Sequence, residues 1–202
     1  AYDVMPSDHI YFRYDEEWNY VDVETGPASG GTNITVTGFG LDVTNDNPEL
    51  QYYCRFNSPW SGYQMDSAAG WVYDSQTLKC TAPPWGGTYP WLSKGANLTI
   101  LHGPRERAIP QYGRLVQFDF YPVWSTFTID NIHGAKGTDP IDFIASGLRY
   151  NVSGLYRCSF TGPNGDQMNS SRFTATSVTH VQCTTPNWGG TFPASNTTVR
   201  LY

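Results

Sequence analysis

Hydrophobic and polar residues alternate along much of this chain. Segments that alternate, or that are rich in β-branched and aromatic residues, are found at 18–23, 34–39, 51–56, 77–81 and 98–102. This pattern is typical of β-strands with one buried face. Gly, Pro, Asn and Asp separate the segments, for example at Gly26-Pro27 and Gly30-Gly31. No segment follows the 3.6-residue period of an amphipathic helix, so the sequence predicts an all-β protein.

The sequence contains one unit twice. Cys80-Thr-Ala-Pro-Pro-Trp-Gly-Gly-Thr-Tyr-Pro90 recurs 103 residues later as Cys183-Thr-Thr-Pro-Asn-Trp-Gly-Gly-Thr-Phe-Pro193. Three more blocks recur in the same order at offsets of 104, 107 and 106: Tyr53–Phe56 as Arg157–Phe160, Gly40-Leu41 as Gly147-Leu148, and Phe12-x-Tyr14-x-x-x-Trp18 as Phe118-x-Phe120-x-x-x-Trp124. Conserved order and near-constant offset indicate a duplicated domain. About seven short strands per copy predict two tandem immunoglobulin-like sandwiches.

The repeat gives the expected domain boundaries. Residues 17–103 form the first predicted domain and residues 122–202 the second, with an N-terminal linker segment at 1–16 and an inter-domain linker at 104–121. Residues 103–117 contain three of the twelve basic residues and two prolines. We expect this stretch to be an extended linker that is ordered only where it docks on a neighbour.

The four cysteines are spaced evenly within the copies. Cys54 and Cys80 are 26 residues apart, and Cys158 and Cys183 are 25 apart. No Cys-x-x-Cys pair of a zinc or redox motif is present. We expect two disulfides, and therefore an oxidising compartment; four free buried thiols are the alternative. Of the three pairings, Cys54–Cys80 with Cys158–Cys183 is favoured, because the others tie separate domains together and break the repeat.

Five Asn-x-Ser/Thr sequons are candidate N-glycosylation sites. They are Asn33, Asn97, Asn151, Asn169 and Asn196. Strand alternation turns Asn33 and Asn97 outward, and Asn97 aligns with Asn196 just before the last strand of each copy. We expect N-linked glycans on at least these three. An unmodified, outward-facing strand asparagine is the alternative at each site.

The residues at the start of the first copy resemble the IPT/TIG family of immunoglobulin-like domains. The resemblance begins at Gly26-Pro-Ala-Ser-Gly-Gly-Thr-Asn-Ile-Thr-Val-Thr-Gly-Phe-Gly-Leu41 and continues at Cys54-Arg-Phe56 and Cys80-Thr-Ala-Pro83. The second copy keeps Gly137-Thr138, Ser146-Gly-Leu148, Cys158-Ser-Phe160 and Cys183-Thr-Thr-Pro186, but departs at Ile132–Lys136. Together these motifs cover roughly residues 18–102 and 124–202.

The resemblance implies a module without chemistry of its own. Extracellular members of the family serve as spacers, adhesion domains or ligand-binding domains, as in the stalks of plexins and fibrocystin-like proteins. Nuclear members bind DNA through basic loops. Because the family has no catalytic residues, none is carried over to this sequence, and the chain is not expected to be an enzyme.

Composition and charge exclude several classes of protein. Only 15% of the residues are charged and the net charge is −6, whereas a nucleic-acid binder needs a basic face. No stretch approaches the ~18 apolar residues of a membrane span, so direct membrane insertion is not expected. The chain starts at Ala1 without an initiator Met or signal-peptide pattern. We expect a mature product or an excised piece.

The Trp-Gly-Gly-Thr loops are the most distinctive local feature. Trp85 with Tyr89, and Trp188 with Phe192, hold the same places in the two copies. We expect each indole to pack against its own domain or an adjoining segment, with its aromatic neighbour close by. The alternative is a sugar-stacking platform, since aromatic rings offer flat apolar faces.

No other cluster predicts chemistry. The four histidines are scattered without a metal-ligand or catalytic spacing. The oxygen-rich loop Asp42–Asn47 lacks the spacing of an EF-hand, and its counterpart after Leu148 has no acids. We therefore expect no calcium, no other metal, no cofactor and no catalytic residue.

These features together favour a non-enzymatic extracellular structural or adhesion protein. We expect a glycosylated two-domain repeat of a longer stalk, array or filament, exported through the secretory pathway to the cell surface. Its expected partners are neighbouring copies of itself, head to tail, and surface glycans or cell-surface proteins. The alternatives are a lectin-like module that binds glycans through the Trp loops, or an accessory binding domain of a secreted enzyme.

Overall fold

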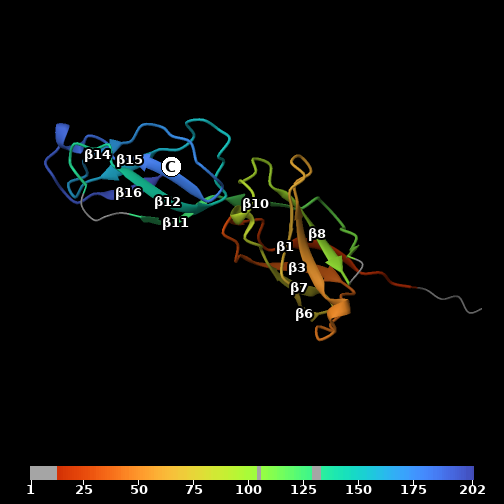
Figure 1. Cartoon of the computed structure of the whole chain (residues 1–202). Coiled ribbons are helices and arrows are strands. Elements are labelled where there is room, and N and C mark those ends of the chain that lie inside the picture. Colours follow the sequence, from red (N-terminus) through yellow and green to blue (C-terminus); the bar gives the residue numbers. More distant parts are fainter. Residues whose placement is uncertain (1–12, 104–105, 129–132) are drawn as a thin grey trace, which may run out of the picture.

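The chain folds into two β-sandwich domains that follow one another in an elongated arrangement (Figure 1). The computed structural model describes residues 13–103, 106–128 and 133–202. Helical structure in these residues is limited to three single turns, η1 (Pro48–Leu50), η2 (Trp85–Gly87) and η3 (Trp188–Gly190). No helix among them is long and apolar enough to cross a membrane. The predicted all-β, two-domain fold is confirmed.

The first domain has one four-stranded antiparallel sheet. Its strands are β1 (Glu17–Val21), β3 (Asn33–Phe39), β7 (Thr77–Thr81) and β6 (Trp71–Asp74), in that spatial order. Strand β3 shows why the sequence forms this sheet. Ile34 and Val36 are fully buried, while Asn33 on the other face is exposed, as the period of two requires.

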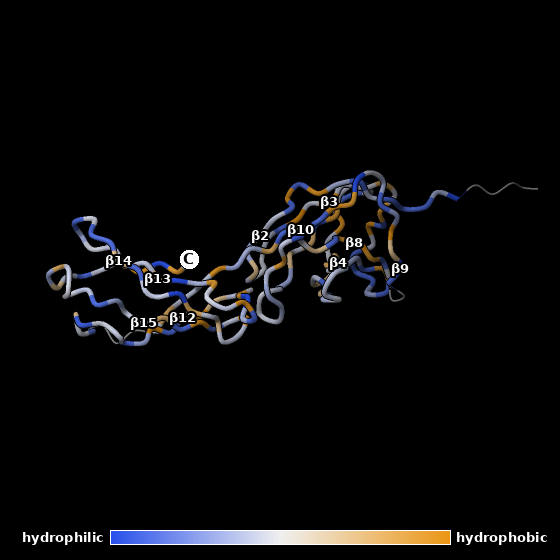
Figure 2. The backbone as a smooth tube through the Cα atoms, turned by 90° about the horizontal axis from the view of Figure 1, so that it is seen from above, coloured by the Kyte–Doolittle hydropathy of each residue, from blue (hydrophilic) through white to orange (hydrophobic). Residues whose placement is uncertain are grey.

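The second sheet of this domain has six strands. Its order is β2 (Thr25–Pro27), β10 (Gln117–Tyr121), β8 (Ala96–His102), β4 (Tyr52–Asn57) and β5 (Gln64–Asp66), with β9 (Arg107–Ala108) also paired to β8. Strand β10 runs parallel to β2 and antiparallel to β8. Figure 2 shows β10 lying between β2 and β8.

Strands β9 and β10 belong to the segment that the sequence marks as a linker. Between them, Ile109 and Val116 are buried, and Phe118 and Phe120 of β10 lie in the core of the first domain. The segment therefore does more than connect two domains. It supplies a strand of the first sandwich, because its Val-x-Phe-x-Phe alternation can bury one apolar face beside β8.

The second domain repeats the same plan with fewer strands. Its first sheet is β11 (Val123–Thr128), β12 (Pro140–Ser146) and β15 (His180–Thr184). Its second sheet is β14 (Gln167–Asn169), β13 (Cys158–Thr161) and β16 (Thr198–Leu201). Among the described strands, β16 lies at the edge of its sheet, whereas its counterpart β8 is flanked on both sides.

Each domain has one disulfide between its two sheets. Cys54 of β4 is bonded to Cys80 of β7, with 6.3 Å between their Cα atoms. Cys158 of β13 is bonded to Cys183 of β15, with a Cα–Cα distance of 6.4 Å. This is the pairing within copies that the repeat favours, and it joins equivalent strands of the two domains.

Candidate functional site: the Trp-Gly-Gly loops and the domain junction

The two Trp-Gly-Gly loops form single helical turns whose indoles point into the protein. Trp85 is fully buried and its Nε1 donates to the carbonyl of Pro90 at 3.1 Å. Trp188 is 7% exposed and its Nε1 donates to the carbonyl of Pro193 at 2.9 Å. Each indole therefore satisfies its only polar group within its own loop.

The aromatic neighbours lie where the sequence places them. The ring centroid of Tyr89 is 5.0 Å from that of Trp85, and the centroid of Phe192 is 4.9 Å from that of Trp188. On Trp85 a further ring is stacked, that of Phe120 from β10, at 5.0 Å and 10°. Both indoles pack in their domains, and neither is exposed as a sugar-stacking platform would be.

Loop η2 of the first domain also forms the junction with the second. Its Gly86 donates from N to Ala28 O at 2.7 Å, and Gly86 O accepts from Gly147 N at 2.9 Å. Trp91 N then donates to Gly147 O at 2.8 Å. Gly147 has φ of 83°, and a Cβ there would lie 2.7 Å from the Ala28 methyl. Glycine is needed because of both the left-handed backbone and this close approach.

Side chains complete the junction around these backbone bonds. The guanidinium of Arg149 lies 5.1 Å from the ring centre of Trp91, in cation–π geometry. A largely apolar cavity of about 480 Å³ lies beside them, with Pro122, Tyr156 and Tyr202 in its wall. Burial raises the pKa of the Tyr156 hydroxyl.

The two halves of this junction occur a second time, on outer surfaces. In the second domain Gly189 N donates to Ala135 O at 2.7 Å, as Gly86 does to Ala28, but Gly189 is exposed. Gly40 of the first domain holds the place of Gly147, with φ of 72°, and is also exposed. The second domain thus has an exposed loop at Gly189, and the first domain has an exposed glycine at Gly40.

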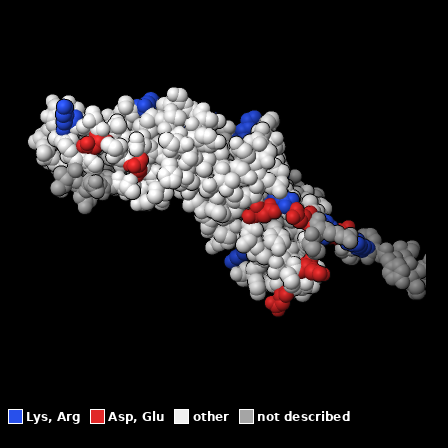
Figure 3. All heavy atoms as spheres, viewed as in Figure 1, with Lys and Arg blue, Asp and Glu red and all other residues white. Residues whose placement is uncertain are grey.

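Charged groups gather mainly at the outer part of the first domain. On the face shown in Figure 3, Asp and Glu lie mostly there, and the second domain has few charged side chains. Tyr52 Oη donates to Glu16 at 2.6 Å, and His102 Nδ1 lies 2.9 Å from the same carboxylate. Arg107 forms an ion pair with it. Burial, and then the hydrogen bond to Glu16, raise the pKa of Tyr52 well above its ordinary value.

The oxygen-rich loop after Leu41 is used for its own turns. Asp42 Oδ1 accepts from Thr44 N at 2.9 Å. Hydrogen bonds from the side chain and then from the backbone of Thr44 lower the pKa of Asp42. Asn45 Oδ1 accepts from Val72 N at 2.8 Å. Within the described ranges, no three His, Cys, Asp or Glu side chains lie close enough to hold a metal ion.

Four of the five sequon asparagines are exposed, namely Asn33, Asn151, Asn169 and Asn196. Asn97 is half-buried, and its Oδ1 accepts from Gln117 Nε2 at 3.1 Å.

The expected alignment of Asn97 with Asn196 is wrong by two residues. Phe56 pairs with Leu98 in the first domain and its counterpart Phe160 pairs with Val199 in the second, so Asn196 matches Gly95. Asn97 lies inside β8, whereas Asn196 precedes β16. Sequons alone align the residues incorrectly because the loops before these strands differ in length.

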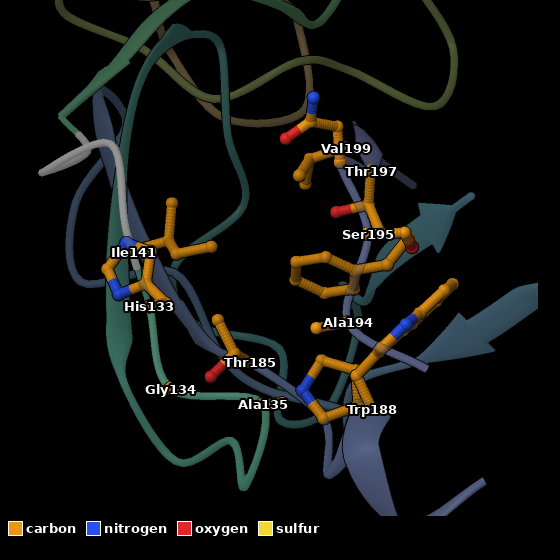
Figure 4. Close-up of a pocket in the computed structure, with 13 residues that line it drawn as sticks. His133, Gly134, Ala135, Ile141, Thr185, Trp188, Ala194, Ser195, Thr197 and Val199 are labelled. Carbon is orange, nitrogen blue, oxygen red and sulfur yellow. The ribbon is translucent and has the colours of Figure 1, made fainter. Parts of the chain in front are cut away.

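The second domain contains a groove that the sequence patterns do not reveal. It has a volume of about 400 Å³ and lies between residues 133–135 and residues 194–199. Figure 4 shows His133 and Ile141 on one side, Thr197 and Val199 on the other, and Trp188 at one end. The signal that could have located it is strand β10, which lies beside β8 in the first domain, whereas no described strand holds that place beside β16.

Two packed sheets, a disulfide between them and the strand order described above define an immunoglobulin-like sandwich. The family model of the IPT/TIG domain matches residues 21–113. The first domain therefore belongs to the IPT/TIG family, a family of non-enzymatic domains. The match ends before the second domain.

Comparisons with solved structures give weak likenesses to multidomain proteins. The extracellular region of plexin A4 is 13% identical, with a TM-score of 0.34, over 85% of this chain and 13% of that one. A tetra-tandem repeat from the extending region of a large adhesion protein is 13% identical, with a TM-score of 0.34, over 93% and 47%. The FN1–FN3 domains of chicken CNTN1 are 10% identical, with a TM-score of 0.30, over 92% and 66%.

This chain thus spans between 13% and 66% of the length of these three structures. No curated protein matches its sequence.

Proposed function

We propose that this chain is a non-enzymatic structural module: a two-domain repeat of a longer extracellular stalk, array or filament whose neighbours are copies of itself. Membership of the first domain in the IPT/TIG family supports a spacer or adhesion role. The two disulfides support an oxidising, extracellular location. The four exposed sequons support glycosylation.

The observation that carries the proposal is the repeated junction. Inside the chain, Gly86 of one domain meets Gly147 of the next through backbone hydrogen bonds. The equivalent loop at Gly189 and the equivalent glycine at Gly40 are both exposed. One copy therefore offers each half of the joint at opposite ends, which is the arrangement that produces an open head-to-tail assembly.

Where Gly40 of one copy meets Gly189 of the next, the joint would rest on backbone contacts. The cation–π pair of Arg149 and Trp91 has no counterpart there, because Asp42 and Ala194 hold those places. The shared part is the glycine approach and its hydrogen bonds, which do not depend on side-chain identity.

Glycan binding through the Trp loops finds no comparable support. Trp85 is fully buried and Trp188 nearly so, whereas a sugar platform needs an open ring face. In this proposal, surface glycans or cell-surface proteins bind to surfaces of the array other than the Trp loops.

Negative-stain electron microscopy of purified native material tests the proposal. We expect thin fibres with an axial repeat of about 70 Å, since each ~100-residue domain is roughly 35 Å across. Replacing the exposed Gly189 by Arg should shorten or abolish the fibres. Isolated two-domain particles at every protein concentration would overturn the array.

A further inference from the structure

The core of the first domain is closed by a strand that follows the repeated unit. Phe118 and Phe120 of β10 are 0% and 2% exposed. Both rings meet Phe56 of β4, with centroids 5.4 Å and 5.3 Å away. Strand β10 fits between β8 and β2: Phe118 is paired with Ala96, and Phe120 with Gly26. Without β10 the edge between β8 and β2 would be open.

The second domain has the surroundings of β10, but no strand among the described residues lies in them. Its groove contains Ile141, Phe160 and Trp188, which correspond to Ile34, Phe56 and Trp85. One wall, residues 133–135, corresponds to residues 26–28, and the other, at Thr197 and Val199, corresponds to Ala96 and Leu98 of β8. The groove of about 400 Å³ thus lies where β10 lies in the first domain.

Core residues are less buried in the second domain than in the first, as expected if no strand fills the groove. The core cluster contains 21 buried residues in the first domain and 11 in the second, among those described. Val199 is part-buried although Leu98 is 1% exposed. Within the part of the chain that the structure describes, no strand covers the second sandwich on the side that β10 covers in the first.

The sequence contains a second copy of the missing strand. Val116-x-Phe118-x-Phe120 recurs 106 residues earlier as Ile10-x-Phe12-x-Tyr14, and both are followed by a Trp four residues after the last member. Residues 10–12 lie outside the described residues. Tyr14 is 88% exposed, whereas its counterpart Phe120 is buried. Tyr14, the described member of this alternating triplet, is not part of the core cluster of the first domain.

The position of the N-terminal residues favours a strand supplied to the groove by another copy of the chain. Figure 1 shows the described chain starting at the side of the first domain that faces away from the second domain. The first described residues therefore lie remote from the groove of their own chain. In a head-to-tail array, the same residues of the next copy arrive beside the groove, because Gly40 of that copy docks on Gly189 just as Gly147 docks on Gly86.

We propose that residues 10–14 of a second copy insert as a strand into the groove of the second domain and complete its sandwich. The inference rests on the proposed function for the identity of the partner, and it names the contact that joins the copies. The inserted strand runs antiparallel to β16 and parallel to residues 133–135. Phe12 takes the place of Phe118 against Phe160, and Tyr14 takes the place of Phe120 against Trp188.

Backbone pairing supports the insertion. In the first domain Leu98 N donates to Val116 O at 3.0 Å. The equivalent bond joins Val199 N to the carbonyl of Ile10 in the incoming strand. Strand addition at an exposed sheet edge combines such main-chain bonds with pockets for alternate side chains, and it also covers an edge that would otherwise promote aggregation.

A peptide-binding experiment tests the groove directly. The acceptor is the full chain carrying Phe12→Ser and Tyr14→Ser, which has no functional donor of its own. The probe is a synthetic peptide of residues 8–16, measured by titration calorimetry and by thermal unfolding of the second domain. We expect one-to-one binding and a raised melting temperature. The same peptide with both serines should bind about a hundredfold or more weaker, because two aromatic rings lose their burial.

An assembly experiment separates this inference from the array itself. The double Ser variant should not assemble, whereas Tyr150→Ser, which removes an exposed aromatic elsewhere, should assemble like the unchanged protein. Fibres formed equally well by the double variant would overturn the inserted strand and leave the array. Peptide binding by a protein that never assembles would keep the groove and overturn the array. Absence of both peptide binding and assembly would overturn both proposals.

Discussion

The amide of Gly147 donates to the carbonyl of Gly86 at 2.9 Å, so two glycines from different domains form the centre of the junction. Both residues are buried there. Their approach leaves no room for side chains, since a Cβ on Gly86 would lie 2.6 Å from the carbonyl carbon of Ser146 and 2.8 Å from the Ala28 methyl. The relation between the domains therefore depends on two positions that lack side chains.

Replacing Gly86 by Val should open this junction. We expect increased domain mobility, seen as a broader distance distribution in small-angle X-ray scattering, and faster proteolysis near residues 119–123. The neighbouring Gly87 supplies a matched control, because nothing lies within 4 Å of a Cβ built there. If Gly87→Val loosens the junction as much as Gly86→Val, the glycine contact is not what holds the domains.

The two loop tryptophans should differ in their importance for stability. Trp85 stacks on Phe120 and is fully buried, so Trp85→Ala should destabilise the first domain by about 3–5 kcal/mol. Among the described residues, no ring holds the place of Phe120 against Trp188. Trp188→Ala should therefore lower the stability of the second domain by less than this in the unassembled chain. Chemical denaturation followed separately for each domain gives the comparison. Equal costs would mean that β10 adds little to the packing of Trp85.

Much of the fold follows from the sequence because its signals are local. Alternation around Ile34 and Val36 defines a strand, and the equal spacing of the cysteine pairs indicates one disulfide per copy. The role of β10 is harder to predict from the sequence. The block Phe118-x-Phe120 precedes the second copy just as Phe12-x-Tyr14 precedes the first. Comparison of the copies therefore assigns it to the linker. Only packing shows that it closes the domain before it.

The groove and the junction are also non-local. Gly147 and Gly86 are ordinary turn glycines in the sequence, and their contact depends on how two finished domains meet. Residues 133–135 and Thr197 are far apart along the chain and polar or small in type. They form a groove because no described strand of the second domain covers them as β10 covers their counterparts in the first.

Reduction of the disulfides should affect the second domain first. A bond closing about 25 residues stabilises by about 3.5 kcal/mol in the chain-entropy estimate. Both domains lose this amount, but the second has the smaller core among the described residues. Calorimetry with a reductant should show its transition move to lower temperature and precede that of the first domain. The opposite order would show that the open groove costs little stability.

Native material should carry N-linked glycans on Asn33, Asn97 and Asn196. Exposed asparagines in strands and loops are accessible to modification, and Asn33 and Asn196 are exposed. Enzymatic deglycosylation should lower the mass, and peptide mapping should locate each site. The bond from Gln117 to Asn97 predicts that Asn97 has the lowest occupancy of the three. An unchanged mass after treatment would contradict both glycosylation and export through the secretory pathway.

Alkaline pH should weaken the first domain through Tyr52. Its hydroxyl is buried, donates to Glu16 at 2.6 Å and accepts from Asp42 N at 2.6 Å. Burial and the hydrogen bond to Glu16 raise its pKa in the folded state well above the ordinary tyrosine value of about 10. Below pH 10 the group is protonated in both states, and its contribution to stability is complete.

Above pH 10 the unfolded chain releases the Tyr52 proton while the folded domain retains it. Stability then falls by up to about 1.4 kcal/mol per pH unit from this group. Tyr52→Phe should lower stability at neutral pH by about 1–2 kcal/mol, because the hydrogen bonds are lost, but its stability should decline less steeply above pH 10. Thermal unfolding between pH 8 and pH 11.5 measures both effects, with Tyr150→Phe as the exposed control. Parallel curves for the unchanged protein and Tyr52→Phe would show that the hydroxyl ionises equally easily in both states, and that the buried bond to Glu16 does not hold its proton.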